Sequence, residues 1–184
     1  MPRDQALLML LSERGEAIVV VTAGDTSMAP HLSGGDAVLA VPPEGEPHRG
    51  DLLLYRQNDY WVVHRFLGRV SGNGGGHGLR TRGDGRNVLD PRLLAGDLMA
   101  RVVALRRAGS WRSLDGRPAR VYAELMALHD LFWAFTGVVA RKVRLGGVVA
   151  AIDLGLLRLL VPLAFPVFHR RIARPAASEP DGAV

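Results

Sequence analysis

The chain of 184 residues contains no cysteine. This absence excludes disulfide bonds, cysteine-ligated zinc and a thiol nucleophile. Aromatic residues are also few, at 6% of the chain. They form no row interleaved with arginine, which a protein that stacks nucleic-acid bases needs. We therefore predict no nucleic-acid partner, although the formal charge of +5 leaves a basic nucleic-acid-binding barrel as a distant alternative.

The apolar runs near the N-terminus are too short for a membrane span or a signal peptide. Ala6–Leu11 and Ala17–Ala23 are separated by the polar segment Ser12–Glu16. A signal peptide needs an unbroken apolar core of about 7–15 residues, and a span needs about 20. We expect residues 1–15 to form a short helix and the second run to form a buried strand, with no membrane anchor.

Residues 16–119 carry short β-type runs between turn signals. The glycine-rich tract Ser71–Gly78 cannot pack a core, so it predicts a flexible hairpin loop. Runs of this length and spacing predict a mainly β fold, with a small, partly closed antiparallel barrel or sheet as the main domain. The predicted strands are Ala17–Thr22, Ala37–Val41, Asp51–Arg56, Tyr60–Val70, Leu79–Arg82 and Leu98–Arg107.

After residue 119 the pattern changes to helical. A second hydrophobic segment, Val148–Phe168, is interrupted by Asp153 and Arg158, and a charge at the bilayer centre costs about 2.5–3.5 kcal/mol. We therefore expect residues 120–172 to form a helical hairpin that either covers its own sheet or a partner, or lies in a membrane interface. Residues 173–184 are expected to be disordered. The apolar stripe expected on the first helix is Val121, Leu125, Leu128, Phe132, Phe135 and Val139.

Four residues could assemble a nucleophilic site. Ser27 lies in the turn sequence Gly-Asp-Thr-Ser-Met-Ala-Pro, His64 follows an apolar run, and Asp84 and Asp90 lie close together in a glycine-bearing turn. A serine becomes nucleophilic only when a base takes its proton and a third group orients that base. Each residue also has a structural interpretation, with Ser27 as a helix cap, His64 as a satisfied buried histidine and Asp84 as a turn residue.

In their order and context, these residues resemble the type I signal peptidases and their relatives. The resemblance is to the endoplasmic-reticulum and archaeal branch, where histidine takes the general-base position that bacterial enzymes fill with lysine. It implies a serine endopeptidase on a folded, mostly antiparallel β scaffold. It covers about residues 20–105 and rests on Ser27-Met28-Ala29-Pro30, Gly35-Asp36, His64-Arg65, Gly83-Asp84 and Asp90.

By this resemblance, Ser27 matches the nucleophile and His64 the general base. Asp84 and Asp90 match the two aspartates of the family's acidic box, and either could orient the histidine. Arg65 matches a motif position that we interpret as structural, as does Met28. A histidine at the reference pKa of about 6.5 can accept the serine proton at neutral pH, whereas a lysine must first be desolvated.

The oxyanion region departs from the family's pattern. Thr26 stands where the family commonly has glycine, and Asp25 stands where the bacterial branch often has a hydroxyl residue. An ionised aspartate cannot donate a hydrogen bond to an oxyanion and repels its charge, so Thr26 or main-chain N–H groups must serve instead. The 26 residues before Ser27 are too few for the DNA-binding domain that the related self-cleaving repressors carry.

Two hypotheses therefore precede the nucleic-acid alternative. The first is a serine endopeptidase that removes a leader or signal-like segment from a peptide or small protein. The second is a catalytically inactive member of the same fold that binds a peptide or partner, and Asp25 is the sign of lost activity. We predict no cofactor and no metal. We expect a cytoplasmic location, where residues 120–172 could make peripheral contact with the inner membrane surface.

Overall fold

The computed structural model describes residues 11, 13–22, 24–57, 60–71, 77–86, 88–142, 159–161 and 163–172. The side chains of residues 95 and 133–142 are outside this description. Of the expected N-terminal helix, residues 11, 13 and 14 are helical. The expectations for residues 1–10, the centre of the glycine-rich tract at 72–76 and the tail at 173–184 lie outside the described residues.

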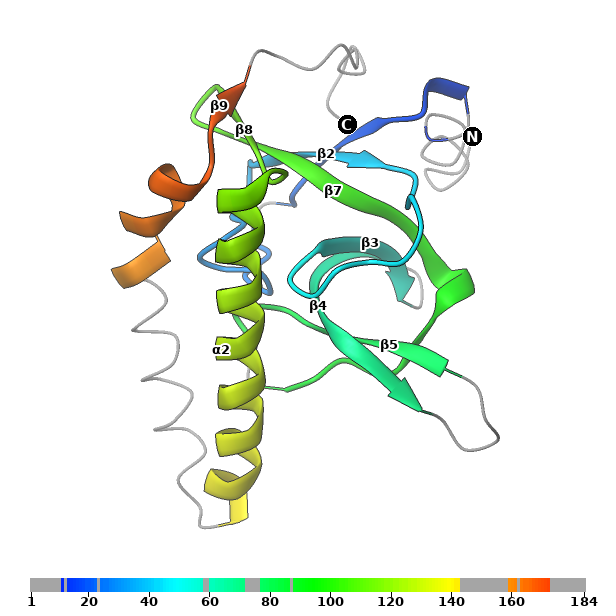
Figure 1. Cartoon of the computed structure of the whole chain (residues 1–184), viewed down its shortest axis with the longest axis vertical. Coiled ribbons are helices and arrows are strands. Elements are labelled where there is room, and N and C mark those ends of the chain that lie inside the picture. Colours follow the sequence, from blue (N-terminus) through cyan, green and yellow to red (C-terminus); the bar gives the residue numbers. More distant parts are fainter. Residues whose placement is uncertain are drawn as a thin grey trace.

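In the described part of the chain, nine antiparallel strands form one curled sheet (Figure 1). Their order is β1-β2-β7-β3-β4-β5-β6, and β8 pairs with both β7 and β9. Within the described residues no pairing joins β1 to β6, so the sheet does not close into a barrel. The expected mainly β, antiparallel fold is confirmed. The strands are β1 (Ala17–Val20), β2 (Ala37–Val41), β3 (Leu52–Gln57), β4 (Tyr60–Ser71), β5 (His77–Arg82), β6 (Leu93–Leu94), β7 (Leu98–Arg107), β8 (Ser110–Ser113) and β9 (Arg171–Ile172).

All six predicted strands are present within a few residues of their expected bounds. The pairing of Ser71 with His77 also shows that the glycine-rich tract joins β4 to β5 as a hairpin. Three further strands, β6, β8 and β9, were not expected from the sequence, and they are two to four residues long. Alternation of apolar and polar residues needs about four to eight residues to be visible, so such short strands leave no signal.

The two faces of β4 have different surroundings. Successive side chains of a strand point to opposite faces, so His64 and Arg65 point apart. His64 pairs with Leu53 of β3, on the face that buries the cluster Leu53, Tyr55, Phe66, Leu79 and Leu93. Arg65 pairs with Leu52 of β3 and with Arg82 of β5, on the face toward the C-terminal helix. One strand thus connects the candidate site to the helix.

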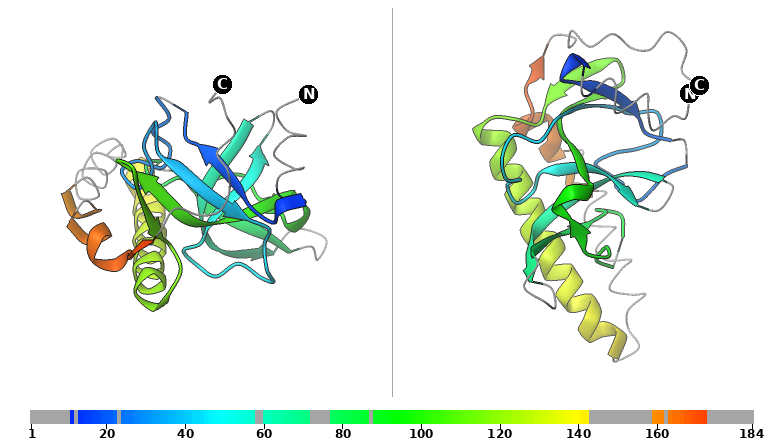
Figure 2. Two further views of the ribbon diagram at one scale, coloured as in Figure 1. Left: turned by 90° about the horizontal axis from the view of Figure 1, so that it is seen from above. Right: turned by 90° about the vertical axis from the view of Figure 1, so that its right-hand side faces the viewer.

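Helix α2 (Arg117–Lys142) lies along one side of the sheet (Figures 1 and 2). Its buried residues Tyr122 and Met126 share a core with Leu52 and Val102 of the sheet. A second helical segment, residues 159–161 and 163–168, adds Val161 and Phe165 to the same core. The described parts of the helical region therefore pack on their own sheet, whereas residues 143–158 of the expected hairpin lie outside the described residues. None of the helices described in the structure is long and apolar enough to cross a membrane.

The expected apolar stripe of α2 is not the face that packs. Its side chains Val121, Leu125, Leu128 and Phe132 are 47–59% exposed, while Ala119, Tyr122, Met126, Ala127 and Asp130 are buried. The reason is the close approach of the helix to Gly50, where even a Cβ would collide with the backbone of Ala123. A face of bulky leucines cannot come that close, so shape rather than hydrophobicity selects the face. The side chains of Phe135 and Val139 lie outside the described residues.

Candidate active site

Residues 21–36, here termed the Ser27 loop, connect β1 to β2. A hydrogen bond of 2.8 Å from Val21 N to Asp36 O joins the two ends of the loop. Met28 is 3% exposed and belongs to the core shared with α2, so it anchors the centre of the loop. Ser27 remains half-buried beside that anchor. The loop thus holds Ser27 at the surface on a fixed backbone.

His64 is buried in β4 and its Nδ1 atom lies 2.6 Å from Oδ2 of Asp90. The hydroxyl of Tyr55 donates to the same carboxylate oxygen at 3.2 Å and lies 3.0 Å from Oγ1 of Thr81. Burial opposes ionisation of Asp90, but the hydrogen bond and charge of His64 outweigh it and lower the Asp90 pKa. Burial raises the pKa of Tyr55, which keeps its hydroxyl a neutral donor. This arrangement places the proton of a neutral His64 on Nδ1 and leaves the Nε2 lone pair free.

The Nε2 atom of His64 faces the backbone of the Ser27 loop. A Cβ on Gly83 would lie 2.9 Å from Nε2 and would collide with the carbonyl oxygen of Ser27. Gly85 N–H donates to that carbonyl at 2.8 Å, and a Cβ on Gly85 would collide with the carbonyl of Thr26. Both glycines are therefore required for the turn at residues 83–85 to contact the Ser27 loop. Nε2 is buried without a hydrogen-bond partner in the described part of the chain, so the Ser27 hydroxyl is not bonded to it here.

Asp84 lies between those two glycines but does not contact His64. Its two carboxylate oxygens accept hydrogen bonds from Arg65 Nε at 2.9 Å and Nη2 at 2.7 Å, and its Oδ2 lies 2.7 Å from Nδ1 of His31. Burial would raise the Asp84 pKa, yet the charge of Arg65, followed by His31, holds this pKa far below its usual range. Asp84 is thus an ionised structural carboxylate that fixes the turn, and Asp90 is the aspartate on His64.

The Asp25 carboxylate is hydrogen-bonded to the Ser27 N–H, which is the group that would stabilise an oxyanion at this serine. Its Oδ1 accepts a hydrogen bond of 2.8 Å from the main-chain N–H of Ser27. Both Asp25 and Thr26 are exposed to solvent. The carboxylate can therefore turn into water without a burial penalty, and a bound substrate oxygen could take its place. In the arrangement described here, the Ser27 amide is capped by a negative charge.

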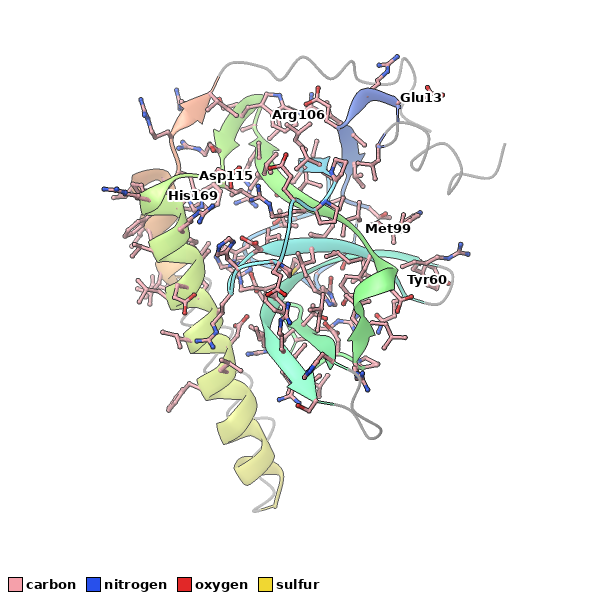
Figure 3. All side chains as sticks on the ribbon, turned by 45° about the vertical axis from the view of Figure 1, so that its right-hand side comes forward. Glu13, Tyr60, Met99, Arg106, Asp115 and His169 are labelled. Carbon is pink, nitrogen blue, oxygen red and sulfur yellow. The ribbon has the colours of Figure 1, made fainter. Side chains whose placement is uncertain are left out.

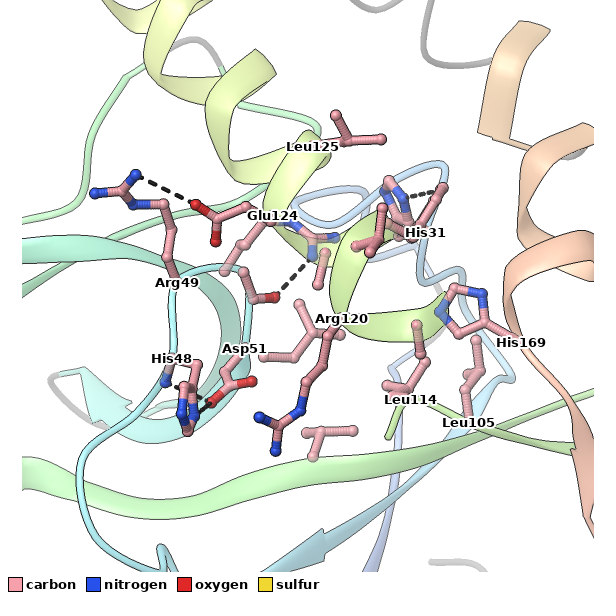
Figure 4. A pocket seen from close by; sticks show the side chains of 18 of the residues that line it. His31, His48, Arg49, Asp51, Leu105, Leu114, Arg120, Glu124, Leu125 and His169 are labelled. Atoms are coloured by element: carbon pink, nitrogen blue, oxygen red, sulfur yellow. Dashed lines mark hydrogen bonds and ion pairs between the residues drawn. The ribbon is translucent and has the colours of Figure 1, made fainter. Parts of the chain in front are cut away.

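A cavity separate from this site lies beside helix α2. It has a volume of about 390 Å³ and lies between α2 and the sheet, and its lining includes Arg49, Asp51, Arg120 and Glu124 (Figure 4). Its wall includes His31 and Arg65 but neither Ser27, His64 nor Asp90. The cavity thus lies behind the candidate site, on the Arg65 face of β4. No group of His, Asp and Glu able to hold a metal ion occurs among the residues described.

The structure brings together most of the residues that sequence analysis selected. Ser27, His64 and Asp90 converge, Asp84 and Met28 support them, and Asp25 and Thr26 flank Ser27 in the exposed part of the loop. Sequence analysis missed Tyr55, Thr81, His31 and Tyr122. Tyr55 could have been found by strand alternation, because it lies two residues beyond the partner of His64. His31 and Tyr122 are 91 residues apart, and no local pattern links them.

The chain matches no protein-family model, and no curated protein matches it.

Proposed function

We propose that this chain is a serine endopeptidase in which Ser27 is the nucleophile, His64 the general base and Asp90 the group that orients the base. The observation that carries the proposal is the 2.6 Å contact between His64 Nδ1 and Asp90, with the unpartnered Nε2 next to the Ser27 backbone. A histidine held in this tautomer can take the serine proton and later return it to the leaving amine. Asp90 stabilises the imidazolium that forms between those steps.

The reaction requires two movements. The Ser27 hydroxyl must come within hydrogen-bond reach of Nε2, and hydrogen bonds of this kind are often long before a substrate binds. The Asp25 carboxylate must also leave the Ser27 amide, so that this N–H can stabilise the oxyanion. Both side chains are at least partly exposed, so neither movement disturbs the core. The substrate class supported by the resemblance is a peptide or small protein with a leader or signal-like segment.

The alternative is a non-catalytic member of the same fold that binds a peptide or partner. The bond from Ser27 N to Asp25 favours it, because an ionised carboxylate occupies the oxyanion donor. The two functions make opposite predictions for a fluorophosphonate probe, which reacts only with an activated serine. We expect stoichiometric labelling of Ser27 in the full chain, mapped by peptide mass spectrometry, and cleavage of members of a mixed peptide library.

The control variants separate the site from other serines and histidines. Ser27→Ala and His64→Ala should each abolish labelling and cleavage, and the double variant should be little worse than either, because the residues act as one unit. Ser33→Ala and His77→Ala change exposed residues of the same types and should leave both activities intact. Absence of labelling and cleavage in the wild-type chain would overturn the peptidase proposal.

We further propose a cytoplasmic location with peripheral contact at the inner membrane surface. Exposed apolar side chains lie on both helical segments, and exposed arginines flank them. Such surfaces favour anionic interfaces because basic residues gain about 1 kcal/mol each near the lipid headgroups. The apolar residues are Val121, Leu125, Leu128, Phe132, Leu159, Leu160, Leu163 and Val167, and the arginines are Arg117, Arg120, Arg170 and Arg171.

A further inference from the structure

One buried side chain, His31, connects helix α2 to the Ser27 loop. It lies four residues after Ser27 and is 3% exposed. Its Nε2 is 2.5 Å from the hydroxyl of Tyr122 on α2, and its Nδ1 is 2.7 Å from Oδ2 of Asp84. A neutral ring with its proton on Nδ1 accepts the hydrogen bond of the Tyr122 hydroxyl at Nε2. Its Nδ1 makes a short polar contact with Asp84 that lacks the geometry of a hydrogen bond. Burial lowers the pKa of His31 more strongly than Asp84 raises it, which favours that neutral ring.

The Asp84 end of this chain of contacts leads to the backbone beside Ser27 and to the strand of His64. Asp84 N–H contacts the Met28 sulfur at 3.4 Å, and the neighbouring Gly85 N–H holds the Ser27 carbonyl at 2.8 Å. The Asp84 carboxylate binds Arg65, which follows His64 in β4. The path from Tyr122 through His31 to Asp84 therefore ends on the loop of the nucleophile and on the strand of the base.

A buried charge cluster holds α2 against this part of the sheet. Arg65 and Arg82 lie directly opposite each other in β4 and β5, and both are buried. Like charges in that position repel, so they need acidic partners. Asp84 supplies one, and Asp130 of α2 supplies the other. Arg82 Nη1 donates to the Asp130 carbonyl at 2.7 Å and lies 3.3 Å from its Oδ1, and Arg65 Nε lies 3.9 Å from its Oδ2. The helix is thus part of the electrostatic balance behind the site.

We infer that Tyr122 and His31 are positioning residues, through which α2 sets the reactivity of Ser27. The inference rests on the proposed peptidase function and deepens it, because it gives the C-terminal helix a part in the chemistry. Without the Tyr122 hydroxyl, Nε2 of His31 loses its donor, and the ring no longer fixes the Ser27 loop relative to His64. A displacement of about 1 Å between reacting groups can slow a reaction by about 100-fold.

The test compares Tyr122→Phe with Tyr60→Phe in the full chain. Tyr60 is 75% exposed at the start of β4, and it lies on the side of the molecule away from His169 and α2 (Figure 3). The measurement is the rate of Ser27 labelling by a fluorophosphonate over a range of probe concentrations, which separates the maximal rate from probe binding. We expect Tyr122→Phe to lower the maximal rate by about tenfold or more with probe binding nearly unchanged. Tyr60→Phe should behave as wild type.

A second variant, His31→Asn, breaks the same chain at its next member. If the two residues act together, the double variant Tyr122→Phe/His31→Asn should be no slower than the slower single variant, because the effects of coupled residues do not add. If Tyr122→Phe lowers the melting temperature but is labelled at the wild-type rate, Tyr122 has only a packing role. That result would overturn this inference and leave the proposed peptidase function intact. A wild-type chain that is not labelled at Ser27 would overturn the proposed function, and the inference with it.

Discussion

His64 Nδ1 lies 2.6 Å from Asp90 Oδ2, whereas Asp84 is turned away from His64 and binds Arg65. The two aspartates of one turn therefore have separate roles in the structure. The sequence left open which of them contacts the histidine. The register of β4 decides it, because His64 and Arg65 point to opposite faces and each takes the aspartate on its own side.

This separation predicts different effects of the two asparagine variants. Asp90→Asn should lower the rate of peptide cleavage by about 10³–10⁴-fold with little change in melting temperature, because control of the histidine tautomer is lost. Asp84→Asn should instead destabilise the fold by about 3–5 kcal/mol, because Arg65 is left buried without its counter-charge. Cleavage rates and thermal unfolding of both purified variants test this. The assignment fails if Asp84→Asn alone is slow and fully stable.

Removal of the Asp25 carboxylate should raise activity. In Asp25→Ala the Ser27 N–H is free, and no negative charge opposes the oxyanion, a repulsion of about 1 kcal/mol near 4 Å in water. We therefore expect cleavage about fivefold faster than in the wild-type chain. Asp97→Ala is the matched control, since Asp97 is also exposed and caps the Leu94 N–H at 3.2 Å, away from the site. Slower cleavage by Asp25→Ala would show that the carboxylate supports the loop instead of blocking it.

The stability of the protein should fall as the pH is lowered from about 6.5 to 4. Burial lowers the pKa of His169 to about 4, against about 6.5 in an unfolded chain, so the unfolded state binds more protons in this window. The lowered pKa of buried His31 acts in the same direction. Burial raises the pKa of Asp130 to about 6, so this group has the opposite effect. Its contribution to the stability of the protein falls as the pH rises through the same window.

His169→Phe tests the contribution of His169. A phenyl ring can keep the stacking on Phe165, whose ring centroid is 4.1 Å away, but it cannot be protonated. The change in unfolding free energy between pH 7 and pH 5 should shrink by on the order of 1 kcal/mol, allowing for partial solvent access. Melting temperatures at both pH values, with His77→Gln as an exposed control, measure it. An unchanged difference between the two pH values in His169→Phe would contradict this assignment.

The helical segments should bind anionic lipid vesicles more tightly than neutral ones. Full-length protein is required, because α2 carries core residues and a shortened chain would lose Tyr122 and Asp130. In flotation experiments the wild-type chain should rise with anionic vesicles and be released by salt, whereas Phe132→Gln/Leu163→Gln should bind weakly. Val88→Gln, an exposed apolar residue outside the helices, is the control. A wild-type chain that stays in solution with both vesicle types would assign this surface to a protein partner.

The sequence alone was enough to predict six of the nine described strands, the antiparallel class and the candidate residues Ser27, His64, Asp84 and Asp90. These features depend on local signals, since alternation marks a strand and glycine marks a turn or a close backbone approach. The same local signals failed at α2. There the hydrophobic stripe pointed to the exposed face, because hydrophobicity does not report how closely a helix must approach its neighbour at Gly50.

The three-dimensional packing was needed to see which aspartate contacts His64, how Asp25 meets the Ser27 amide, and that His31 joins α2 to the Ser27 loop. Each of these depends on residues that are distant in the chain or on the direction of one side chain. Tyr122 and His31 meet only because the helix packs on the Arg65 face of β4, and Arg65 and Arg82 require Asp130 there. Such contacts follow from the packing of whole elements, so the linear order of residues does not reveal them.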